Sequence, residues 1–279
     1  MRKLLALVAI MLVSVVACAD YLNVIEPIRS TLMSQQTIRV GDAGPGQTFA
    51  IVADRASDGG NCVNNYCQYG WDQLVPINDT ISPIPDGWEV QASQTQETPM
   101  RAKIKIGPIT PDGQYLIGMK AVDEGNYDGL GNLTFYVNVT VTRDVFTISV
   151  DPSSAEAGVG EPAIYNVKIT NTGVASDPFE ISVKDGTLPA WSYKKSALVD
   201  YGSEKIVPYE VVLNEENTKT FTLVVNSLSS PLIHAEVPLV VNARSSIVND
   251  WKATTHGLTI FPIILEPVYA LMGLIGNLL

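Results

Sequence analysis

Few residues in this sequence can carry out acid-base, nucleophilic or metal chemistry. The chain of 279 residues has only three cysteines and two histidines. It contains no G-x-S-x-G elbow, no phosphate-binding Walker loop and no H-E-x-x-H zinc motif. A structural zinc site needs four ligands, and no second cysteine pair exists to complete one. The sequence therefore predicts a non-enzymatic protein without a cofactor or a metal, although the placement of its many carboxylates, and with it a glycosidase pair, stays open.

Basic residues are also few. The chain has 18 Lys and Arg against 29 Asp and Glu, which gives a formal net charge of −11. Because an acidic surface repels a phosphate backbone, we expect no nucleic acid partner. Apolar residues make up 46% of the chain, which is enough to bury a core. The length corresponds to about two domains of roughly 100–150 residues.

The N-terminus has the three parts of a secretory signal peptide. Residues 2–3 are basic, residues 4–16 form an apolar run, and residues 17–19 offer an A-x-A cleavage site. The apolar run is shorter than the roughly 20 residues that span a bilayer. We therefore predict a signal peptide over residues 1–19 and an extracellular, cell-surface protein. A linker or short helix is expected over residues 20–35.

The three cysteines have different predicted fates. Val15-Val16-Ala17-Cys18 resembles a lipobox, in which Cys18 would carry a lipid, but the A-x-A site favours simple cleavage. Either outcome leaves Cys62 and Cys67, which lie close together in the sequence. In an oxidising compartment such a pair predicts a local disulfide that closes a loop.

Two further sets of residues point to the exterior of an exported protein. Asn78, Asn132 and Asn138 each begin an N-x-T sequon and are candidate glycosylation sites. The segment 123–129 gathers oxygen ligands in a turn but lacks the later glutamate of an EF-hand loop. It predicts a solvated turn, with a calcium site as the alternative.

Alternating apolar and polar residues dominate from residue 36 to residue 245. Residues 146–150, Phe-Thr-Ile-Ser-Val, show the period of a half-buried strand. About seven such short strands, separated by Gly, Pro, Asn and Asp clusters, are typical of an immunoglobulin-like sandwich. We predict an all-β fold with two tandem Ig-like β-sandwich domains, over residues 36–143 and 144–246.

Aromatic residues divide into core and surface candidates. Trp88 and Trp191 occupy corresponding positions in the two modules. Because sandwiches commonly bury one large aromatic between their sheets, we predict that both lie in the core, with an exposed platform for a sugar ring as the alternative. Tyr66, Tyr69 and Trp71 lie beside the cysteine loop and are the candidates for exposed ligand contact.

The second module resembles a known family. Residues 165–173 (YNVKITNTG), 178–183 (PFEISV) and 188–191 (LPAW) are similar to the strand, turn and corner of CARDB-like modules. The resemblance covers residues 146–243 well and the first module loosely. It implies β-sandwich repeats of bacterial or archaeal surface proteins, which are associated with adhesion or serve extracellular enzymes as accessory modules. It implies a fold and a location, and it transfers no functional residue.

The C-terminal segment Leu258–Leu279 is mostly apolar and long enough to cross a bilayer. Glu266 near its middle, Pro262 and Pro267 are unfavourable in such a helix, and no basic residue follows. We expect this hydrophobic, helical tail to associate with a membrane. Packing on a partner subunit and a strand of the sandwich are the alternatives.

These features together predict a structural or adhesive surface protein. Its tail would hold the β-sandwich modules at the membrane, to other surface proteins or to sister subunits. One alternative is an extracellular carbohydrate-binding module that contacts glycans. The other is a subunit of a surface filament or lattice assembled by strand exchange.

Overall fold

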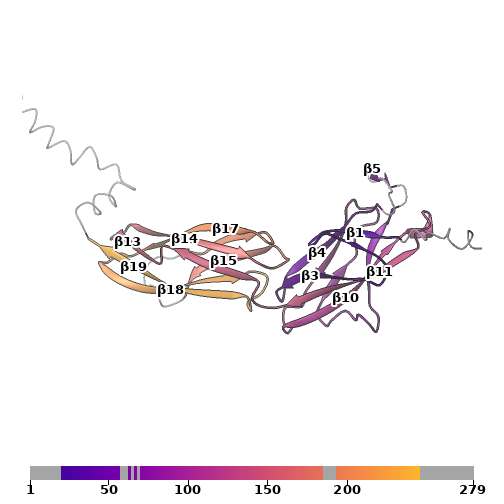
Figure 1. The fold of residues 1–279 in the computed structure, drawn as a ribbon. Coiled ribbons are helices and arrows are strands. Elements are labelled where there is room, and N and C mark those ends of the chain that lie inside the picture. The colour runs from indigo at the N-terminus through magenta and orange to yellow at the C-terminus, as the bar shows by residue number, and fades with distance from the viewer. Residues whose placement is uncertain (1–19, 57–61, 64–65, 68–69, 185–192, 246–279) are drawn as a thin grey trace, which may run out of the picture. The chain divides into compact units, whose positions relative to one another are not determined.

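The computed structural model describes residues 20–56, 62–63, 66–67, 70–184 and 193–245 (Figure 1). These residues form β-strands joined by turns and one 3-10 turn, η1 (Glu124–Asn126). The expected all-β class is confirmed for these ranges. The described residues divide into two compact units. Unit 1 ends at Arg143 and also includes residues 173–175, and unit 2 begins at Asp144.

Unit 1 consists of two sheets around one core. Its strands are β1 (Leu22–Glu26), β2 (Ser30–Leu32), β3 (Thr37–Ala43), β4 (Thr48–Ala53), β7 (Gln73–Ile77), β8 (Glu89–Gln91), β9 (Met100–Lys105), β10 (Gly113–Val122) and β11 (Asn132–Val141). One sheet has the order β2-β1-β4-β9-β8 and the other β3-β11-β10-β7. A separate hairpin joins β5 (Cys62–Val63) and β6 (Tyr66–Cys67).

The strand order of unit 1 defines an immunoglobulin-like sandwich. β1, β4, β9 and β8 correspond to strands A, B, E and D, while β7, β10 and β11 correspond to C, F and G. β3 runs parallel to β11 and carries the chain across to the second sheet. Alternation places the core: in β9, Met100, Ala102 and Ile104 are buried and the three basic residues between and after them are exposed.

The expected linker or short helix over residues 20–35 is wrong. These residues form the hairpin β1–β2, and β1 pairs antiparallel with β4. Leu22, Val24 and Leu32 are buried in the core of unit 1. The sandwich therefore begins at residue 22 and not at residue 36, because two short strands with few alternating positions gave too weak a pattern to predict.

Unit 2 is a second sandwich. Its strands are β12 (Phe146–Asp151), β13 (Ser154–Gly158), β14 (Pro162–Asn171), β15 (Asp177–Val183), β16 (Lys195–Val199), β17 (Glu204–Val212), β18 (Asn217–Ser227) and β19 (His234–Arg244). The sheets have the orders β12-β14-β17 and β13-β19-β18-β15-β16. In unit 2, β16 pairs with β15, the strand before it. The corresponding strand of unit 1, β8, pairs with β9, the strand after it.

Aromatic side chains fill the core of unit 2. Tyr165 and Phe221 meet edge to face with ring centroids 5.5 Å apart, and Phe146 lies 4.7 Å from Phe179. The Tyr165 hydroxyl donates to the carbonyl oxygen of Val240 at 2.7 Å. Burial raises the pKa of Tyr165 to about 12, because the phenolate would lose its hydration.

Among the described residues, no helix has the length and apolar character needed to cross a membrane. The predicted signal peptide with Cys18, residue Trp191 and the tail Leu258–Leu279 lie outside the described residues.

Candidate functional site

Trp71 belongs to the core of unit 1, although the sequence predicted that it is an exposed ligand contact. The side chain is fully buried, and its Nε1 donates to the carbonyl oxygen of Tyr21 at 3.0 Å. Its backbone N–H donates to the carbonyl oxygen of Arg55 at 2.7 Å. The prediction that Trp71 is an exposed ligand contact is therefore wrong, because the indole is buried and bonded to Tyr21, the residue before β1.

The other two predicted ligand contacts are Tyr66 and Tyr69. Tyr66 belongs to β6, which pairs with β5, but only its backbone is described. Tyr69 lies outside the described residues. Ligand contact by these two tyrosines stays a prediction.

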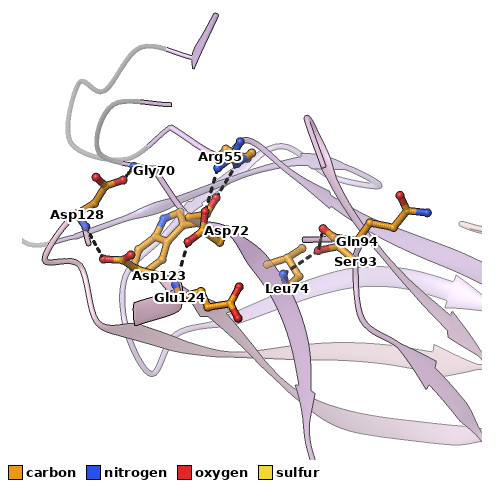
Figure 2. Close-up of polar contacts among 10 residues, drawn as sticks. Arg55, Gly70, Asp72, Leu74, Ser93, Gln94, Asp123, Glu124 and Asp128 are labelled. Atoms are coloured by element: carbon orange, nitrogen blue, oxygen red, sulfur yellow. Dashed lines mark hydrogen bonds and ion pairs between the residues drawn. The ribbon is translucent and has the colours of Figure 1, made fainter. Parts of the chain in front are cut away.

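An ion pair fixes the base of the cysteine loop (Figure 2). Arg55 Nη2 lies 3.0 Å from Asp72 Oδ1, and Arg55 Nε donates to the carbonyl oxygen of Trp71 at 2.8 Å. An antiparallel bridge joins Ala56 to Gly70 just outside this pair. The chain thus leaves and re-enters the sandwich at one point, between Ala56 and Gly70.

The turn that follows β10 is held by its own carboxylates. Asp123 is 5% exposed, and its Oδ2 accepts from the backbone N–H groups of Asp128 and Leu130, each at 3.1 Å. Asp128 Oδ2 in turn accepts from Gly70 N at 2.9 Å (Figure 2). Asp72 Oδ2 accepts from Glu124 N at 2.9 Å. These oxygens bond backbone amides and so join this turn to the base of the cysteine loop.

These hydrogen bonds are relevant to the alternative prediction of a calcium site in the segment 123–129. Carboxylate oxygens that bind a calcium ion must converge on one point. In the described part of the chain, no group of three Asp, Glu, His or Cys side chains is placed to hold a metal ion. The segment 123–129 is instead a hydrogen-bonded turn with Tyr127 90% exposed at its surface.

Trp88 lies in the core, as the sequence predicts. It is 7% exposed, and its Nε1 donates to Thr110 Oγ1 at 3.0 Å. Its ring lies 5.2 Å from that of Tyr115. The alternative of an exposed platform for a sugar is thus excluded for Trp88.

The three sequon asparagines differ in exposure. Asn78 and Asn132 are exposed, the first after β7 and the second at the start of β11. Asn138 is half-buried in the middle of β11, between Leu116 of β10 and Arg39 of β3, and its Oδ1 is buried. Asn78 and Asn132 therefore have more room for a glycan than Asn138.

The backbone sets the two loop cysteines opposite each other. In the hairpin β5–β6, Cys62 pairs with Cys67. Opposed residues of an antiparallel pair have Cα atoms about 4.5–5.5 Å apart, within the range of about 4.4–6.8 Å that a disulfide requires. This register is compatible with the predicted disulfide.

The comparisons with known proteins identify no family for the chain. No family model matches the chain, and no curated protein matches it. Among solved structures, a chimeric titin Z1Z2 is 12% identical over 82% of this chain and 99% of that one, with a TM-score of 0.36. The D00-D0 domain of intimin is 16% identical over 79% and 98%, with a TM-score of 0.26.

A β-glucosidase from Listeria innocua in complex with glucose is also similar, with 15% identity and a TM-score of 0.25. The match covers 35% of this chain and 16% of the enzyme, so the chain spans less than a fifth of that protein's length. Likeness at this level carries no statement about activity. The strand orders of both units place the chain among the immunoglobulin-like β-sandwich proteins. A CARDB-like relationship stays a prediction from the sequence.

Proposed function

We propose that this chain is a non-enzymatic, exported cell-surface protein whose immunoglobulin-like units serve as structural or adhesive modules. The observation that carries the proposal is the bonding of the polar side chains beside the cysteine loop of unit 1. Arg55, Asp72, Asp123 and Asp128 bond one another or backbone amides. Polar side chains that are bonded in this way hold the loops in one conformation, and the loops then present a defined surface.

Export rests on the sequence. The leader over residues 1–19 directs secretion, and the register of Cys62 against Cys67 suits a disulfide that forms outside the cytoplasm. The exposed asparagines of two sequons, Asn78 and Asn132, are available for glycosylation where the host has the enzymes. The tail Leu258–Leu279 supplies the attachment, to a membrane or to sister subunits.

Cell fractionation tests this proposal. Cells that produce the full chain are compared with cells that produce a chain ending at residue 257. We expect the full chain in the membrane fraction, exposed to added protease, and the shortened chain in the medium. Equal release of both chains would remove the anchor, and retention of both inside the cell would contradict export.

A further inference from the structure

The outer face of β9 carries a row of cations on an otherwise acidic protein. Arg101, Lys103 and Lys105 are all exposed, whereas the residues between them are buried. Side chains on one face of a strand are spaced by about 6.8 Å, two residues of about 3.4 Å each. The chain as a whole has a net charge of −11. We call Arg101, Lys103 and Lys105 the basic row.

The charge of the basic row is only partly balanced. Arg101 lies 3.8 Å from Glu26, and Lys105 lies 3.4 Å from Glu89. Lys103 stands between uncharged residues, since Ala50 of β4 and Gln91 of β8 are paired with it. The centre of the row is therefore positive and accessible.

The same face continues into a hollow over β1 and β2. Its lining residues are Asn23, Val24, Ile25, Arg29, Ser30 and Thr31, and its volume is about 520 Å³. In the sheet order, only β4 separates β1 from β9, so the hollow and the basic row lie about 10 Å apart at a strand spacing of about 4.8 Å. β4 turns the small residue Ala50 to this face, which leaves room above the sheet.

We infer that this face binds an acidic polysaccharide, with the carboxylates of the sugar chain along the basic row and its hydroxyl groups over the hollow. The inference deepens the proposed function and rests on it, because it names the partner of an exported module. The amide of Asn23 and the hydroxyl of Thr31, which donates to Asn23 Oδ1 at 2.8 Å, supply polar groups that suit a sugar.

Charge spacing favours a polysaccharide over a nucleic acid. Duplex DNA carries one charge per about 1.7 Å of its axis, so that a protein with a large negative charge is repelled along the whole contact. An acidic polysaccharide carries its carboxylates on separate sugar rings. Its wider spacing matches a row of single cations better, and fewer of its charges meet the acidic remainder of the protein.

Affinity electrophoresis of the purified full chain in mild detergent tests the inference. The gels contain polygalacturonate, neutral dextran or duplex DNA. We expect polygalacturonate to retard the protein at low ionic strength and dextran to have no effect. In about 1 M salt the retardation should vanish, because the Debye length falls to about 3 Å.

Two lysine variants, one in the basic row and one in the other sheet, assign the binding to the basic row. Lys103→Gln should weaken retardation about two- to fivefold, the effect expected of one exposed charge. Lys120→Gln removes one lysine from β10 in the other sheet and should leave retardation unchanged. Thermal melting must show that both variants fold.

The inference is overturned if polygalacturonate does not retard the protein, if both variants lose equal affinity, or if dextran or the duplex DNA retards it as strongly. Since these gels use purified protein, failure here leaves the fractionation result standing, and the reverse also holds.

Discussion

Arg55 and Asp72 form a nearly buried ion pair, with Nη2 and Oδ1 3.0 Å apart and side chains 4% and 15% exposed. Removing one partner of such a pair leaves a buried charge without compensation. We expect Arg55→Ala to lower the free energy of unfolding of unit 1 by about 3–5 kcal/mol, as measured by urea unfolding. The exposed pair of Arg143 and Asp112 supplies the control. Arg143→Ala should cost less than about 1 kcal/mol, and equal costs would contradict the role assigned to Arg55.

Substitution of Trp71 tests whether its indole stabilises the core or contacts a ligand. Trp71→Ala should destabilise unit 1 by about 3–5 kcal/mol, because it leaves a cavity in a filled core. Trp71→Phe should cost less, although it also loses the hydrogen bond to Tyr21. Tyr127→Ala, at a side chain 90% exposed, should change stability by less than about 0.5 kcal/mol. A stable Trp71→Ala protein would show that the indole is not part of the core.

Two buried tyrosines predict that unit 2 loses stability in alkali. Burial raises the pKa of both Tyr165 and Tyr209 to about 12, from 10 in the unfolded chain. The folded state then holds protons that the unfolded state releases. The contribution of these two tyrosines to the free energy of unfolding should therefore be constant below pH 10 and fall between about pH 10 and pH 12. Each tyrosine contributes on the order of 2 kcal/mol to this fall.

Urea unfolding at a series of pH values measures this effect. Tyr165→Phe should flatten the alkaline slope, and Tyr127→Phe, at an exposed position, should leave it unchanged. An unchanged slope in Tyr165→Phe would mean that other groups cause the loss.

Among the described strands, β17 lies at the edge of its sheet, where an added strand could pair in the alternative of strand exchange. Pro208, in the middle of β17, has no N–H to donate, and its carbonyl oxygen accepts from Lys195 Nζ at 2.8 Å. An added strand would find neither group available there. We expect Pro208→Val together with Lys195→Ala to increase self-association, measured by sedimentation velocity. Lys219→Ala is the charge-matched control. If the double variant stays as monodisperse as the parent, this edge is protected in another way.

The alternation of side chains was sufficient to predict most strands. Residues 146–150 and 133–141 are strands because their apolar positions recur with period two, and this local property needs no knowledge of partners. The hairpin β1–β2 was missed because each strand offers only one or two buried positions. The core position of Trp88 followed from its place in the repeat.

The burial of Trp71 could not be predicted from its neighbours in the sequence. Its position depends on Tyr21 and Arg55, which reach it only after the chain has folded. The cysteine loop nearby suggested an exposed surface, whereas the indole is fully buried. The basic row could have been found from the sequence, since Arg101, Lys103 and Lys105 alternate with apolar residues.

The most direct test of the central claim, export of a disulfide-containing surface protein, is the intact mass of the protein released from the surface of its own cells. We predict a chain that begins at Asp20, with Cys62 and Cys67 joined and the mass lower by their two thiol hydrogens. A chain recovered only from the cytoplasm, with residues 1–19 still attached and both thiols free, would contradict the account.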